Sequence, residues 1–129
     1  MTPIWIDETV EAFGRQMGLA HFALNERGAA GVIFENGVSF RLERTDDAMI
    51  ASVRLAAPAS DEAVRKVLTE AHPEMQAKDG GLVRAACLLR TGETLLALRI
   101  AEHEISVVTL EQAFNRLWER ALELGRTMA

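Results

Sequence analysis

The chain has 129 residues, 49% of them hydrophobic, and a formal net charge of -5 at pH 7. This length suits one compact domain with a sizeable core, and the apolar content excludes a disordered chain. An acidic chain without a basic run is poorly suited to nucleic acid or an anionic membrane surface. No stretch approaches the roughly 20 apolar residues that span a bilayer.

The N-terminus and the cysteine content indicate the compartment. The first residues, MTPIWIDETVEAF, lack the basic and apolar regions of a signal peptide. The one cysteine, Cys87, has no partner for an internal disulfide. We expect a single domain over residues 1–129 in a reducing, cytosolic compartment.

The first half of the chain predicts a helix and three strands. Asp7 is a candidate N-cap for a helix over 8–17, which ends before Gly18. Its apolar stripe consists of Val10, Phe13 and Met17. An extended lead-in over 19–24 precedes strands at 31–35, 38–44 and 48–56. Asn36-Gly37 predicts a two-residue type I′ turn between the first two strands.

The second half predicts a helix, two strands and a last helix. Ser60 can cap a helix over 61–72, which Pro73 ends. Strands follow over 82–90 and 94–102, joined by a tight turn. Thr109 and Gln112 match a capping box for a helix over 110–125. The predicted order is α-β-β-β-α-β-β-α, an α+β domain with a twisted antiparallel five-stranded sheet and three helices.

No catalytic or metal-binding constellation stands out. His21, His72 and His103 lie in different settings and lack metal-ligand spacing with cysteine or with one another. Cys87 lies in an apolar strand, which favours a small buried hydrophobe over a reactive thiol. We therefore predict no catalytic residue, no metal and no cofactor.

Apolar surface is the feature in excess. The strand TLLALRI places Leu96, Leu98 and Ile100 on one face, but Leu95 and Ala97 on the other. Three helices do not easily cover both faces of the last two strands. Either a helix lies on each side of this hairpin, or a protein partner covers the second face.

Three stretches resemble the class I type III secretion chaperones, the Tir-chaperone family. They are FGRQMGLAHFALNERGAAGVIFENGVSFRLERTDDAMIASVRLAA, ACLLRTGETLLALRI and TLEQAFNRLWERALEL. The resemblance covers most of the chain, from about Val10 to Leu124, and the predicted element order agrees with it. It implies a bacterial cytosolic homodimer, without enzymatic activity or cofactor, that holds the N-terminal chaperone-binding segment of a secreted effector in an extended state.

The resemblance also implies two sets of site residues. In the family, the second helix and fourth strand build the dimer interface, which here corresponds to Val64, Val67, Leu68, Ala71, Ala86 and Leu88. The client binds apolar patches of the first helix and nearby strands, partly by strand addition to a sheet edge. Here that implies Phe13, Met17, Phe22, Leu24, Val32 and Phe34. The secretion ATPase is a further candidate partner, whereas nucleic acid and membrane are not.

Two other functions remain open at this point. One is a protein-binding adaptor of the same fold that has no part in secretion. The other is a small enzyme that uses His103 or His21 with nearby carboxylates, which predicts a deep polar pocket around a histidine.

The predicted dimer interface can be tested by Leu68→Asp. A carboxylate buried in an apolar interface is left without a partner, so we expect the variant to be monomeric. Light-scattering mass measures this directly. A variant that keeps the mass of the wild-type dimer would place Leu68 outside the interface.

Overall fold

The computed structural model describes residues 4–35, 37–55, 83–88 and 94–128 of the chain. Its elements are α1 (Ile4–Gln16), β1 (Ala29–Ile33), β2 (Ser39–Arg44), β3 (Ala48–Leu55), β4 (Val83–Leu88), β5 (Thr94–Ala101), the 3-10 turn η1 (Glu102–Glu104) and α4 (Val107–Met128). The strands form one antiparallel sheet in the order β1-β2-β3-β5-β4. The α+β class is therefore confirmed, while the helix predicted over 61–72 lies outside the described residues.

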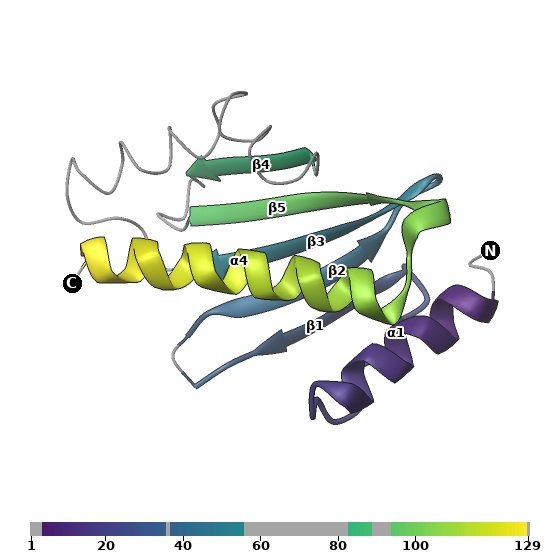
Figure 1. Cartoon of the computed structure of the whole chain (residues 1–129). Helices are drawn as coiled ribbons and strands as arrows, with labels where there is room; N and C mark the ends of the chain where they lie inside the picture. Colours follow the sequence, from purple (N-terminus) through teal and green to yellow (C-terminus); the bar gives the residue numbers. More distant parts are fainter. Residues whose placement is uncertain (1–3, 36, 56–82, 89–93, 129) are drawn as a thin grey trace.

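Both described α-helices pack on the same face of the sheet, with α4 running across the strands in Figure 1. The alternation of the strands explains this arrangement. In β2 and β3 every second residue is buried, and the residues between are more exposed. The buried residues include Phe40 and Leu42 on β2 and Ala51 and Val53 on β3. We call the helix-covered side the inner face and the opposite side the outer face.

Six aromatic rings form a connected cluster on the inner face. Phe40 on β2 lies 5.9 Å from Phe13 on α1 and 4.9 Å from Phe114 on α4, measured between ring centroids. Phe22, from the segment after α1, lies 5.8 Å from Phe13. Trp118 stacks on Phe114 at 5.6 Å. Phe34, after β1, completes the cluster. Edge-to-face and offset pairs at these distances are favourable, so the rings tie both helices to the sheet.

The β1–β2 hairpin differs from the sequence prediction. Phe34 N–H donates to the Val38 carbonyl at 2.9 Å, and Gly37 N–H donates to the Phe34 carbonyl at 2.9 Å. The strands therefore close between Phe34 and Val38, so the two-residue type I′ turn is wrong. Gly37 has a φ of 84°, a conformation that favours glycine. This register pairs Val32 with Phe40 on the inner face.

The first strand also starts earlier than predicted, at Ala29 rather than at residue 31. The Asn25 side-chain oxygen accepts hydrogen bonds from the backbone N–H groups of Arg27 and Ala29, at 2.9 and 3.1 Å. This Asx-type turn follows the extended segment over 19–24 and leads directly into β1.

Both described helices begin earlier than predicted. α1 starts at Ile4, so Asp7 lies in its first turn and does not cap it. Ile6 is fully buried on the same stripe as Val10, which explains the extra turn. α4 starts at Val107, where the Ser106 hydroxyl accepts the Thr109 N–H at 3.1 Å. The N-cap is therefore Ser106, and the predicted box at Thr109 and Gln112 is wrong.

The aromatic cluster predicts which substitution is most damaging to the fold. Phe40 has no exposed surface and three ring neighbours, so Phe40→Ala should lower the free energy of unfolding by about 3–5 kcal/mol. Urea denaturation measures the change. Ile33→Ala is the control, because Ile33 is 78% exposed and should cost less than about 0.5 kcal/mol. Equal losses in both variants would contradict the assigned core.

Candidate functional site

One long edge of β1 is a free edge of the described sheet, since β1 pairs only with β2 among the described strands. Hydrogen bonds at both ends of β1 establish which of its residues bond to β2. Arg44 N–H donates to the Gly28 carbonyl at 2.7 Å, and Phe34 N–H donates to the Val38 carbonyl at 2.9 Å. Because antiparallel bonding alternates, even-numbered residues of β1 bond to β2 and odd-numbered ones direct their backbone groups away from it.

One of the three outward-facing positions is already satisfied within the chain. Asn25 N–H donates to the Ala29 carbonyl at 2.8 Å, and the Asn25 side chain accepts the Ala29 N–H. The backbone groups of Gly31 and Ile33 thus form the accessible part of the edge. Unpaired strand edges are templates for another strand.

Half-buried apolar side chains lie beside this edge on the inner face. Val32 and Phe34 pack against the core but keep part of their surface exposed. Phe34 makes an edge-to-face contact with Trp118 of α4, with ring centroids 4.9 Å apart. Apolar surface next to unpaired backbone groups is the combination that binds an extended peptide.

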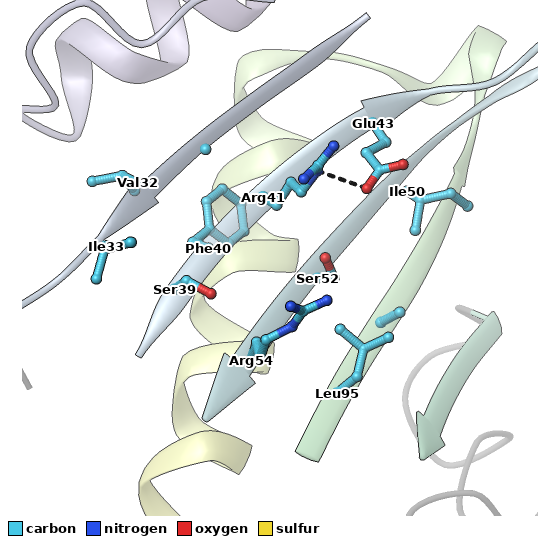
Figure 2. A pocket seen from close by; sticks show the side chains of 12 residues that line it. Val32, Ile33, Ser39, Phe40, Arg41, Glu43, Ile50, Ser52, Arg54 and Leu95 are labelled. Carbon is cyan, nitrogen blue, oxygen red and sulfur yellow. Dashed lines mark ion pairs between the residues drawn. The ribbon is translucent and has the colours of Figure 1, made fainter. Parts of the chain in front are cut away.

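The outer face holds a separate feature, a hollow of about 370 Å³ that we call the outer hollow (Figure 2). The sheet register places its lining in cross-strand rows. The middle row runs from Gly31 through Arg41 and Ser52 to Ala97. Three of these four residues have small side chains or none, so little projects from the sheet along this row, which forms the floor of the hollow.

The rows on both sides of this floor carry mostly larger side chains. One flanking row consists of Ile33, Ser39, Arg54 and Leu95, and the other contains Glu43 and Ile50. No helix of the described residues covers this face. Leu95 and Ala97 lie on this face and are half-buried. It is therefore the second apolar face of β5, the one for which the sequence left open what covers it.

The outer face carries several arginines. The Arg41 Nε lies 2.7 Å from Glu43 Oε1, and both side chains are about half exposed (57% and 51%). Arg99 Nη2 lies 3.0 Å from Asp47 Oδ2, again between exposed groups. Arg54 is exposed as well. Such surface ion pairs contribute little stability and are easily exchanged for other partners.

Residues 5–124 match the model of the family described as type III secretory system chaperone SycN. The chain belongs to this family. The chaperone resemblance of its sequence is thereby confirmed. None of the curated proteins matches the chain.

Solved structures, one of them of a type III secretion chaperone, share the fold. The ExsC–ExsE complex aligns with a TM-score of 0.79 and 15% identity, over 97% of this chain and 94% of that chain. The Yersinia pestis chaperone SycH, in complex with a stable fragment of YscM2, gives 0.69 and 16%, over 92% and 98%. The HopA1–SchA chaperone–effector complex gives 0.69 and 17%, over 99% and 98%.

The six predicted effector-binding residues fall into two groups in this chaperone fold. Phe13 and Phe22 are core residues, 0% and 6% exposed, and contact each other. Four are half-buried and keep exposed surface, namely Met17, Leu24, Val32 and Phe34. Their role in binding stays a prediction, but the half-buried group is the one that a client can reach.

The predicted dimer interface lies largely outside the described residues, which exclude Val64, Val67, Leu68 and Ala71. The other two positions lie on β4, where Ala86 pairs with Leu96 and Leu88 with Thr94. β4 is the terminal strand of the described sheet. The interface also stays a prediction.

The two histidines within the described residues share no site, while His72 lies outside the described residues. His21 is exposed, and His103 is exposed with its Nε2 3.5 Å from Glu104 Oε1. Neither lines the outer hollow. Within the described ranges, no three His, Cys, Asp or Glu side chains converge as metal ligands would, and no helix is long and apolar enough to cross a membrane.

The outer hollow and the bonding phase of β1 were absent from the sequence prediction. Both depend on register, which no single strand reveals. The available signal was the alternation in SFRLER, which predicts one polar face for β2.

The half-buried position of Phe34 makes it a usable probe of the edge. Phe34→Ala removes its contacts with Trp118 and Phe114, and we expect a loss of about 2 kcal/mol, less than for a fully buried phenylalanine. Thermal and urea unfolding check this. A loss as large as that of Phe40→Ala would show that Phe34 is core and unavailable to a client.

Proposed function

We propose that this protein is a non-enzymatic chaperone that binds the N-terminal segment of a type III secreted effector and keeps it extended for secretion. The observation that carries this proposal is the accessible edge at Gly31 and Ile33, with half-buried apolar side chains beside it. Family membership supports it, and so do the SycH complex and the HopA1–SchA chaperone–effector complex, which share the fold.

Binding in this proposal needs no bond chemistry. A client segment loses conformational entropy when it is ordered. Backbone hydrogen bonds to Gly31 and Ile33 set its register, each with a net contribution of about 0.5–1.5 kcal/mol. Apolar client side chains that cover Val32, Phe34 and Trp118 add about 25 cal/mol for each Å² removed from water.

The same proposal includes the assembly. A single domain over residues 1–129, with a second helix over 61–72, would complete the order α-β-β-β-α-β-β-α. Two copies would pair through that helix and β4, using the predicted interface residues. The protein would work in the bacterial cytoplasm, beside the secretion ATPase, as membership of the chaperone family suggests.

Strand addition is tested by Gly31→Pro. Proline has no N–H, and at this position the missing donor faces away from β2, so the fold should persist. Capture of the N-terminal segment of a secreted protein encoded beside this chain should weaken by roughly five- to tenfold. Isothermal titration on the purified proteins gives the affinity.

Gly31→Ala is the matched control, because it keeps the N–H. Its added Cβ would meet only the Phe40 carbonyl oxygen at 3.6 Å and Arg41 Cγ at 4.0 Å, which are ordinary contacts. The control should therefore bind like the wild type. If Gly31→Pro also binds like the wild type, the client does not pair with β1.

A further inference from the structure

The outer hollow shares Gly31 and Ile33 with the edge site but extends well beyond it. Its floor and walls come from the outer faces of four strands, and an added strand beside β1 would not fill it. Its walls include the apolar side chains of Ile33, Ile50 and Leu95. Apolar side chains around a concave floor favour an occupant with apolar groups of its own.

The charges around the outer hollow oppose those of the chain as a whole. The chain has a formal net charge of -5, yet the lining holds two arginines, Arg41 and Arg54, against one carboxylate, Glu43. Arg99 adds a third guanidinium at the next outward position of β5 beyond Ala97, and its ion-pair partner Asp47 adds a second carboxylate, which leaves three guanidinium groups against two carboxylates. A locally basic surface on an acidic protein attracts an acidic partner and disfavours a second copy of the same acidic chain.

The register also sets the spacing of these guanidinium groups. Arg54 lies in the row of Leu95, and Arg99 lies four residues further along β5. At about 3.4 Å per residue the two rows are roughly 14 Å apart, with the small floor residues between them. An occupant that inserts apolar groups between these rows would place its flanking residues within reach of the arginines.

We propose that the outer hollow is a second client-binding surface, selective for a segment in which acidic side chains flank apolar ones. This inference rests on the proposed chaperone function and deepens it, because it defines a chemical class of client. Guanidinium groups bind carboxylates through two parallel hydrogen bonds, so Arg41 and Arg54 would exchange internal partners for client carboxylates. Selectivity then comes from charge, whereas the edge at Gly31 and Ile33 binds backbone and is indifferent to side-chain charge.

The test uses two synthetic peptides as probes. One contains leucine, alanine and glutamate, and the other is identical except for lysine at every glutamate position. Fluorescence anisotropy measures their binding to the full chain at low salt and at about 0.5 M salt, where charge interactions are screened. The wild type should bind the glutamate peptide at least about fivefold more tightly than the lysine peptide at low salt only.

Three double variants locate the effect. Arg41→Glu with Arg54→Glu should abolish or invert the preference. Arg15→Glu with Arg27→Glu is the control, because it changes the net charge equally at exposed positions of α1 and of the turn before β1. The control should keep the preference. Arg41→Gln with Arg54→Gln, which adds no negative charge, should abolish the preference without inverting it and covers the case that the glutamate variant does not fold.

Three outcomes would overturn the inference. The first is equal wild-type affinity for the two peptides. The second is a preference that is lost equally in the control. The third is a loss of dimer mass confined to the Arg41 and Arg54 variants, which would make this face an interface between copies.

Capture of the secreted segment by the wild type and by Gly31→Pro is measured in parallel. If Gly31→Pro weakens capture while the arginine variants change nothing, the charge-selective surface fails and the chaperone proposal stands. If the wild type captures no segment, the chaperone proposal fails, and the charge-selective surface falls as well because it rests on that proposal.

Discussion

The packing of Phe40 between Phe13 and Phe114 is the interaction on which the rest of the structure depends. These three rings come from β2, α1 and α4, elements far apart in the chain, and none of them is more than 8% exposed. Phe22 and Trp118 extend the cluster to the segment after α1 and to the middle of α4. Both described helices are thereby held on one face of the sheet, where their apolar stripes are removed from water.

Packing both helices on one face has a consequence for function. The described helices leave the outer face of the sheet uncovered and leave β1 with one unpaired side. Such features are liabilities for a protein that works alone, because exposed edges and apolar hollows invite association. For a protein that holds another chain they are the means of binding. The same core that stabilises the fold therefore also sets the position of both candidate binding surfaces.

The sequence predicted the α+β class and the positions of the described strands to within about two residues, because alternation and turn residues are local signals. It misplaced the N-cap of α4, since Thr109–Gln112 matches a capping box while Ser106 makes the cap. A Cβ at Gly14 would lie 2.7 Å from the Cβ of Phe22, so this glycine permits the close packing of the segment after α1. Tertiary contacts of this kind, like the strand register, leave no local pattern.

In the proposed complex, the client adds a strand at the backbone of Gly31 and Ile33. Amide hydrogen exchange at single-residue resolution, with and without the effector segment, measures this pairing. We expect strong new protection of the Gly31 and Ile33 amides in the complex. The amides of Ala30 and Val32, already bonded to β2 by the alternation of the hairpin, should change far less. Full binding of the segment with no added protection at Gly31 and Ile33 would show that the client does not pair with β1.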